Sequence, residues 1–262
     1  MSMLHESFSL SPSLVPGESL AARRVLLPGG VLDAAGRCHK AVRLRELDGS
    51  DEELLCADYS SGARQVTVFL ARAIAAIEGF DGPVDEALVA DMLVGDRDYL
   101  LLRLRQIEVG DAVHQVLRCP APACAKKVDV DFSISELPVR RLERVEEGYE
   151  LRLLVADGPP LAARSRLPSG ADLEAVWPLL AVNAAEANTR LYSRILQRVE
   201  GMPRLDEAAL RAMPLRLRNQ LAQFIASQAP GPDLGIEIIC PHCGADMSYR
   251  FDLTGFFLPS VQ

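Results

Sequence analysis

The chain has 262 residues and a net charge of −8; 49% of its residues are apolar and 24% are charged. This composition is typical of a folded globular protein, of one elaborate domain or two modest ones, and it excludes an intrinsically disordered chain. No stretch is long and apolar enough for membrane insertion, and the acidic balance argues against a nucleic-acid-binding surface, which needs basic residues to neutralise phosphates.

The first part of the chain predicts a flexible arm and then a region of strands and helices. Residues 1–18 are polar and lack the basic and apolar regions of a signal peptide, so we expect a poorly ordered arm. In the N-terminal region, residues 19–110, two short strands are expected over residues 24–33, across the Pro-Gly-Gly turn that begins at Pro28. A further strand is expected over residues 39–47, where apolar and basic side chains alternate.

Helices are expected in the rest of this region. The first one has Ser50 or Asp51 as its N-cap, with acidic residues in its first turn. Apolar residues at helical spacing predict an amphipathic helix over residues 65–80 and a shorter helix over residues 84–93. Another helix begins at Gly95-Asp96 and buries its leucines. We expect its arginines to lie on the solvated face: Arg97, Arg103 and Arg105.

Two cysteine pairs stand far apart in the second half of the chain. Each pair follows a short apolar strand and precedes an alternating apolar segment, so strand, cysteine knuckle and strand occur twice. The first copy runs from residues 112–117 through Cys119 and Cys124 to Val128, Val130 and Phe132. The second copy runs from residues 236–239 through Cys240 and Cys243 to Met247, Tyr249 and Phe251.

Four thiolates are the ligand set of a tetrahedral structural zinc site. A short loop between paired cysteines turns both sulfurs toward one ion, and thiolates are soft ligands that select zinc. We therefore predict that residues 111–137 and 234–257 form the two halves of a zinc ribbon around one structural zinc ion. Its predicted ligands are Cys119, Cys124, Cys240 and Cys243.

Three other interpretations of the cysteines fit the sequence less well. Burial as small hydrophobic residues does not account for two matched pairs. The Cys-Pro-His-Cys tetrapeptide at 240–243 is that of thioredoxin-like oxidoreductases, but that chemistry needs a helix N-terminus where a strand is expected here. A disulfide framework needs an oxidising compartment. Cys38 and Cys56 have no partner at ligand spacing, and His242 inside the second knuckle is more often a solvated loop residue than a ligand.

The predicted fold class is α+β. Between the two ribbon halves, residues 138–233 are expected to form an insertion that begins with a β-hairpin of residues 149–155 and 161–167. Helices are expected after this hairpin, over residues 172–187, 188–199, 206–213 and 215–227. A zinc ion shared by the ribbon halves would close the long loop between them, so its expected role is architectural.

No pattern of catalytic residues stands out in the sequence. There is no glycine-rich phosphate loop, and none of the four histidines pairs with an acidic residue or a serine in a recognisable catalytic arrangement. We therefore expect a protein that is not an enzyme and that takes no small-molecule substrate.

A resemblance to a known family covers about residues 40–137 and extends to the C-terminal cysteine knuckle through its matching frame. The segment 94–105, Val-Gly-Asp-Arg-Asp-Tyr-Leu-Leu-Leu-Arg-Leu-Arg, is followed by the first cysteine pair and by the acidic strand 128–137, which ends in Glu-Leu. This combination resembles the baseplate hub assembly chaperones of T-even-type contractile phages and related contractile injection systems. Residues 44–53 also resemble entry segments of phage tail assembly proteins. The resemblance does not imply a metal, which rests on the four thiols of this sequence.

The resemblance implies a non-enzymatic assembly factor or structural component of a contractile-tail baseplate hub that acts by protein–protein binding. Its expected partners are baseplate hub, spike or tail proteins. Its expected location is the cytoplasm of a bacterium or an infected host cell, with incorporation into the tail particle as a further option. A zinc-ribbon nucleic-acid-binding or regulatory protein is the leading alternative, and a thiol oxidoreductase is the third hypothesis.

Overall fold

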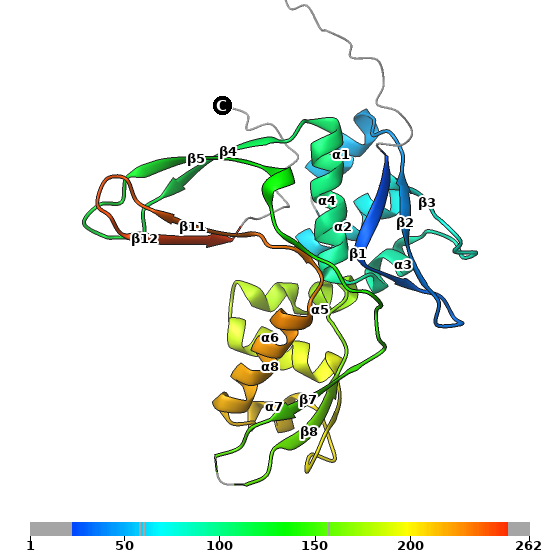
Figure 1. The fold of residues 1–262 in the computed structure, drawn as a ribbon, viewed down its shortest axis with the longest axis vertical. Coiled ribbons are helices and arrows are strands. Elements are labelled where there is room, and N and C mark those ends of the chain that lie inside the picture. Colours follow the sequence, from blue (N-terminus) through cyan, green and yellow to red (C-terminus); the bar gives the residue numbers. More distant parts are fainter. Residues whose placement is uncertain (1–22, 58, 60, 157, 251–262) are drawn as a thin grey trace, which may run out of the picture.

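The computed structural model describes residues 23–57, 59, 61–156 and 158–250. These residues form two lobes and an arm that projects to one side (Figure 1). Both helices and several small sheets are present, so the predicted mixture of helix and strand is confirmed. Two predicted segments lie outside the described residues. They are the poorly ordered N-terminal segment, residues 1–18, and the last part of the second ribbon half, residues 251–257, which includes Phe251. None of the helices in the described ranges combines the length and apolar character that a bilayer crossing needs.

The first lobe packs helices against a three-stranded antiparallel sheet. Its strands, in sheet order, are β1 (Arg24–Leu32), β2 (Cys38–Leu44) and β3 (Ile74–Ile77). Its helices are α1 (Gly49–Cys56), α2 (Gly62–Ala73), α3 (Glu86–Asp91) and α4 (Val94–Glu108). Val42 of the sheet, Phe69 of α2 and Leu100 of α4 are fully buried in one apolar core, which stabilises the lobe by removing apolar surface from water.

The second lobe has the same plan. Its antiparallel sheet contains, in order, β7 (Tyr149–Leu153), β8 (Leu161–Ser165) and β9 (Leu196–Val199). Its helices are α5 (Gly170–Leu180), α6 (Ala184–Ile195), α7 (Glu207–Arg211) and α8 (Leu215–Gln228). Leu153 of β7, Ile195 of α6 and Leu221 of α8 are fully buried in a second core.

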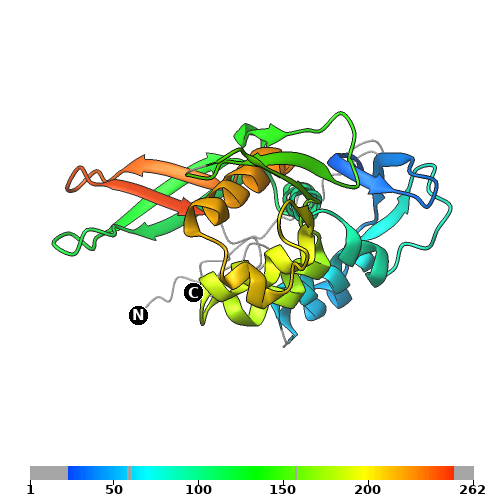
Figure 2. The same ribbon diagram turned by 90° about the horizontal axis from the view of Figure 1, so that it is seen from below.

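Two β-hairpins side by side make up the arm (Figures 1 and 2). They are β4 (Ala112–Arg118) with β5 (Lys127–Ser133), and β11 (Gly235–Ile239) with β12 (Asp246–Arg250). A short 3-10 helix, η1 (Ile134–Glu136), follows the first hairpin. A two-residue pair, β6 (Val139–Arg140) with β10 (Gly231–Pro232), then joins the segment after the first hairpin to the segment that leads into the second.

The chain consists of two copies of one structural unit. From β1 to β5, and again from β7 to β12, the order is strand, strand, helix, helix, strand, helix, helix and hairpin, with the short β10 as an addition in the second copy. We name residues 24–133 repeat 1 and residues 149–250 repeat 2. The sheets share an irregularity, because the register shifts between Arg43 and Leu44 in β2 and between Arg164 and Ser165 in β8.

A buried aspartate with two arginines marks the same position in both repeats. The residues are Arg45, Asp51 and Arg72 in repeat 1, and Arg166, Asp172 and Arg194 in repeat 2. Burial acts to raise the pKa of both carboxyls. The hydrogen bonds from Arg45 and Arg166, the backbone N–H groups of Asp48 and Ser169 and the nearby positive charges together outweigh burial and hold each pKa below its ordinary value. Each cluster ties the start of one helix to the end of the next.

A second arginine network also recurs. One guanidinium donates to a helix carbonyl and to a threonine hydroxyl, at 2.8–3.1 Å in both copies. The residues are Arg97, Ala63 and Thr67 in repeat 1, and Arg218, Ala185 and Thr189 in repeat 2. Arg97 is only 2% exposed, so its predicted place on a solvated face was wrong. The helical spacing placed it correctly on α4, but the start of α4 is covered by α2 and by the start of α5.

The predicted pair of strands over residues 24–33 was also wrong, because β1 is one strand. The Asp96 carboxylate accepts the backbone N–H groups of Gly29 and Gly30 at 2.7 and 2.8 Å and holds the irregular middle of this strand. The N-cap of α1 is Asp48 rather than either predicted residue, because its carboxylate accepts the N–H of Ser50.

Two predicted helices extend too far. The helix expected over residues 65–80 ends at Ala73, and the helix expected across residues 188–199 ends at Ile195. In both repeats the following residues leave the helix to pair with the sheet as β3 and β9. Residues 138–233 do contain the predicted hairpin and helices; their boundary as an inserted domain stays a prediction.

Candidate metal centre

The first knuckle closes the hairpin of β4 and β5. The Cys119 N–H donates to the carbonyl of Lys126, and the Cys124 N–H donates to the carbonyl of Ala121, each at 2.9 Å. Ala125, directly after the second cysteine, has a φ of 46°, in the left-handed region that residues other than glycine rarely adopt. This tight turn brings both thiols to the same side of the loop.

The second knuckle repeats this geometry at the end of β11. The Cys240 N–H donates to the carbonyl of Ala245 at 2.8 Å, and the Gly244 N–H donates to the carbonyl of Cys240 at 2.9 Å. Gly244 has a φ of 74° and occupies the position of Ala125 in the first knuckle. Glycine adopts this conformation without the steric cost that a side chain brings.

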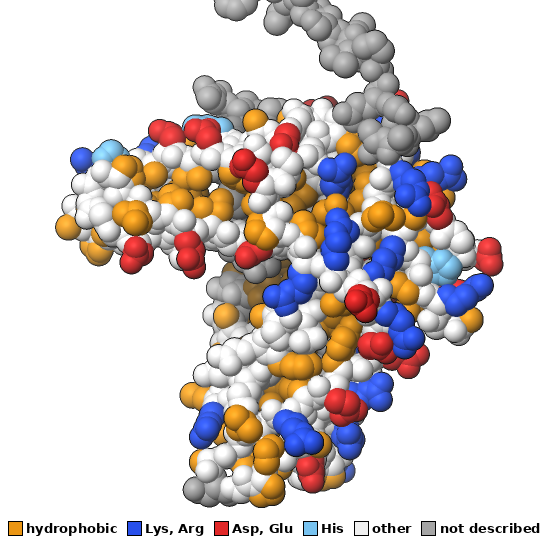
Figure 3. Space-filling model, in the orientation of Figure 1, with side chains coloured by type: hydrophobic (Ala, Val, Ile, Leu, Met, Phe, Trp, Pro, Cys, Tyr) orange, Lys and Arg blue, Asp and Glu red, His pale blue; other side chains and the backbone are white. Residues whose placement is uncertain are grey.

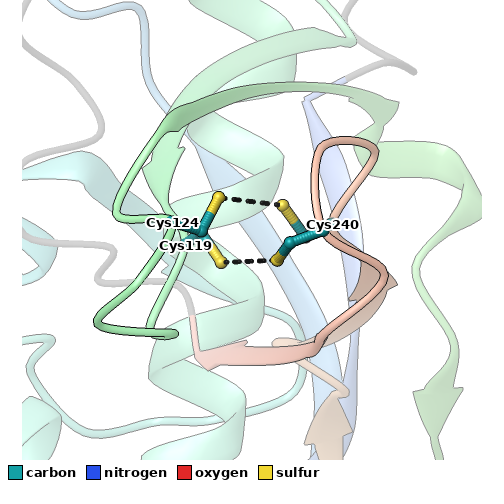
Figure 4. A group of neighbouring side chains, drawn as sticks. Cys119, Cys124 and Cys240 are labelled. Carbon is teal, nitrogen blue, oxygen red and sulfur yellow. Dashed lines mark hydrogen bonds between the residues drawn. The ribbon is translucent and has the colours of Figure 1, made fainter.

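The two knuckles face each other, and their four sulfurs form one cluster (Figure 4). The Sγ atoms of Cys119 and Cys243 are 3.7 Å apart, and those of Cys124 and Cys240 are 3.9 Å apart. All four lie within 4.8 Å of one another. The sequence predicted this set as ligands, and the structure brings all of its members together.

Apolar packing holds the hairpins in this position. Cys119, Val128, Cys240 and Met247 are buried in a small cluster of their own, separate from the cores of the two lobes. The Tyr249 hydroxyl of the second hairpin donates to the Arg118 carbonyl of the first. The arm is thus joined along its length as well as at its sulfurs.

The local electrostatics favour at least one thiolate. Burial acts to raise the pKa of Cys240, but the N–H groups of His242 and Cys243 and the neighbouring thiols outweigh it and lower the pKa to about 6. At Cys119 the N–H of Ala121 acts to lower the pKa, but burial and the three other thiols raise it to about 12. Four thiolates this close repel one another, so a cation is needed for all of them to ionise.

The donor set and its spacing fit a metal ion. In a tetrahedral site with Zn–S bonds of about 2.3 Å, neighbouring sulfurs are about 3.8 Å apart, close to the two shortest separations here. An ion bound by all four would join residues 119 and 243 across 124 positions of chain. Closing so long a loop constrains the unfolded state and stabilises the folded one.

The remaining cysteines and histidines lie apart from this cluster. His242 is exposed, and its Nε2 atom is 3.3 Å from the carbonyl oxygen of Lys127. Cys38 is half-buried beside Gly29, and Cys56 is exposed at the end of α1. The chain after Cys243 enters β12 rather than a helix, so the second knuckle lacks the helix N-terminus of a thioredoxin-like site.

A cleft of about 730 Å³ lies where the two lobes meet the base of the arm. Figure 3 shows this face hollowed between the arm and the second lobe. The cleft is lined mainly by apolar residues from the start of α4, from α5 and from the end of α8, with Asp98, Arg140 and Asp233 as its charged members. Sequence reasoning did not predict this cleft, because it is formed by segments from both repeats.

One protein-family model, described as T4 bacteriophage base plate protein, matches residues 40–258. The matched range covers most of both lobes and both cysteine pairs. The sequence matches no curated protein and no solved structure at a significant level.

Proposed function

Because the chain belongs to the family of T4 bacteriophage base plate proteins, we propose that it is an assembly factor or structural component of the baseplate hub in a contractile tail or injection system. The observation that supports this proposal most directly is the family match over residues 40–258. The likeness of residues 94–105 and 128–137 to baseplate hub assembly chaperones narrows the role to the hub.

The protein acts by binding other proteins and carries out no catalysis. The four clustered cysteines hold one structural zinc ion, which fixes the two hairpins to each other. An arm built in this way is rigid, so it can present a defined surface without paying the ordering entropy of a flexible loop. Both lobes lie at the base of the arm, and the two knuckles lie at its far end (Figure 1).

Proteins are the expected partners because the arm carries charges of both signs. Its exposed side chains include Arg118, Lys126, Lys127, Asp129, Asp131, Glu237 and Asp246. A nucleic-acid-binding ribbon needs a continuous basic face to displace counterions from phosphates. The arm surface therefore favours protein recognition over the nucleic-acid alternative.

The test of this function is deletion of the gene in the system that encodes it, followed by electron microscopy of the tails. The proposal predicts tails without a complete baseplate and restoration by the wild-type gene. Normal, functional tails in the deletion strain would contradict it. Mass spectrometry of purified tails then separates the two roles, since a structural component remains in the particle and an assembly factor does not.

A further inference from the structure

The two repeats meet at a junction in which the start of one helix fills a groove of the other repeat. The Val94 N–H donates to the Pro168 carbonyl at 3.1 Å, and the Gly170 N–H donates to the Met92 carbonyl at 3.0 Å. Gly170 is the first residue of α5, and a Cβ atom there would lie 1.2 Å from the Nη1 atom of Arg97. The start of α5 therefore fits against repeat 1 only because this residue is glycine.

A charged pair and a hydroxyl extend the junction. Glu174 of α5 accepts a hydrogen bond from the Thr67 hydroxyl of repeat 1, and it lies 3.9 Å from the guanidinium of Arg64. Repeat 1 thus supplies a groove, and repeat 2 supplies the helix start that occupies it.

The same groove in repeat 2 is open. It has a volume of about 410 Å³ and is lined by Asn183, Ala185, Glu186, Thr189, Arg211, Met213, Leu215 and Arg218. Leu215 takes the place of Val94 at the start of the last long helix of its repeat. Its side chain is 76% exposed, whereas Val94 is half-buried beneath the start of α5. An apolar side chain that is covered in one copy is therefore left in water in the other.

The matching helix start in repeat 1 is also exposed. It consists of Leu47, which is half-buried, and of Asp48 and Gly49, which are exposed. These three residues occupy the positions of Pro168, Ser169 and Gly170. Around a Cβ atom placed on Gly49 there is no neighbouring atom within 4 Å. Glycine in a helix costs stability relative to alanine, and no neighbour within the described part of the chain requires glycine here. A closely approaching partner, as at Gly170, accounts for it.

We propose that the chain associates head to tail, with the start of α1 from one copy seated in the open groove of repeat 2 of the next copy. The Leu47 carbonyl then accepts the Leu215 N–H, and the Gly49 N–H donates to the Met213 carbonyl, as in the internal junction. This self-association goes beyond the baseplate role and does not depend on it.

The acidic helix start meets positive charges at some points of the proposed contact. The helix start carries Asp48, Glu52 and Glu53, which are exposed, and the groove carries Arg211 and Arg218. Glu186 stands in the place of Arg64 and Glu53 in the place of Glu174, so the ion pair of the internal junction is replaced there by two carboxylates, which disfavour the contact at that point. Arg211 replaces Ala90 of repeat 1 and supplies a positive charge at another point of the groove. Because the two surfaces differ, the contact is heterologous and generates a ring or a helical filament.

The proposal is tested by sedimentation velocity on the full chain with two variants that each disable one surface. Gly49→Gln blocks the helix start and leaves the groove intact, whereas Leu215→Glu charges the groove and leaves the helix start intact. Both positions are exposed, so thermal unfolding should show a wild-type fold. Leu154→Glu, at another exposed leucine of repeat 2, is the matched control.

The wild-type chain and the control are expected to form species that grow with concentration from the micromolar to the millimolar range. Each disabling variant alone is expected to remain a monomer. An equal mixture of the two should form a dimer and nothing larger, because one intact groove and one intact helix start remain. A wild-type chain that stays monomeric, variants that assemble as the wild type does, or a mixture that stays monomeric would each overturn the proposal.

Discussion

The Sγ atom of Cys119 lies 3.7 Å from the Sγ atom of Cys243, although 124 positions of chain separate the two residues. The first cysteine belongs to repeat 1 and the second to repeat 2. The candidate metal centre therefore lies between two copies of one unit, and each copy supplies half of it. A metal ion at this point joins the repeats directly, in addition to the contact between α5 and the groove of repeat 1.

The junction between the repeats makes opposite predictions for two glycines at equivalent positions. Gly170→Ala should destabilise the fold by about 2 kcal/mol, because the new methyl group overlaps the buried Arg97 guanidinium. Gly49→Ala should leave stability unchanged or raise it by up to about 1 kcal/mol, because its surroundings are open and alanine favours a helix. Urea unfolding of dilute, monomeric protein measures both effects. Equal effects of the two substitutions would contradict the described junction.

The buried guanidinium of Arg97 should be costly to remove. Burial lowers its pKa to about 10, so it remains charged at neutral pH. Arg97→Met should lower the free energy of unfolding by about 2 to 4 kcal/mol, because the Ala63 carbonyl and the Thr67 hydroxyl lose their charged donor. Arg103→Met on the same helix serves as control and should change stability by about 0.5 kcal/mol or less. A small effect at Arg97 would mean that water replaces the lost donor.

Asp96 should make stability fall as pH rises. Burial raises the pKa of its carboxyl from 3.8 to about 6, although the N–H groups of Gly29 and Gly30 act against this shift. Between these values the folded chain retains a proton that the unfolded chain has lost. The contribution of Asp96 to the free energy of unfolding is therefore most favourable below about pH 4. It declines as the pH rises through about 6, by about 3 kcal/mol in total.

Asp96→Asn isolates this contribution. The free energy of unfolding of the wild type minus that of the variant should decrease between about pH 4 and pH 6, whatever the constant offset between the two proteins. Asp91→Asn, at an exposed carboxylate on α3, is the matched control. A flat difference for Asp96→Asn would contradict the raised pKa of this buried carboxyl.

Patterns local in sequence predicted much of this fold, and contacts distant in sequence account for the errors. The cysteine spacing and the alternation around it identified both hairpins, because a knuckle is a local structure. The helix expected over residues 65–80 was too long because Ile74 and Ile77 pair with β2, which no helical periodicity reveals. Arg97 was placed in solvent because the start of α5, which covers it, is distant in sequence.

The repetition of the whole unit was detectable in the sequence but was found only at the cysteines. The segment Ile77-Glu78-Gly79 recurs as Val199-Glu200-Gly201, and both glycines have a φ near 75°. Most other matched positions of repeat 1 and repeat 2 carry different residues. The two repeats are therefore recognised by their equivalent hydrogen bonds rather than by residue identity. The open groove of repeat 2 follows only from comparing the two copies in three dimensions.

The most direct test of the metal centre is the zinc content of the purified chain and of its Cys119→Ser/Cys240→Ser variant, measured by elemental analysis alongside thermal unfolding. Cys38→Ser/Cys56→Ser is the matched control, since both of those thiols lie outside the cluster. The account predicts one zinc ion per chain in the wild type and in the control, and loss of both the ion and thermal stability in the first variant. A wild-type chain without bound metal, or zinc retained after Cys119 and Cys240 are replaced, would contradict it.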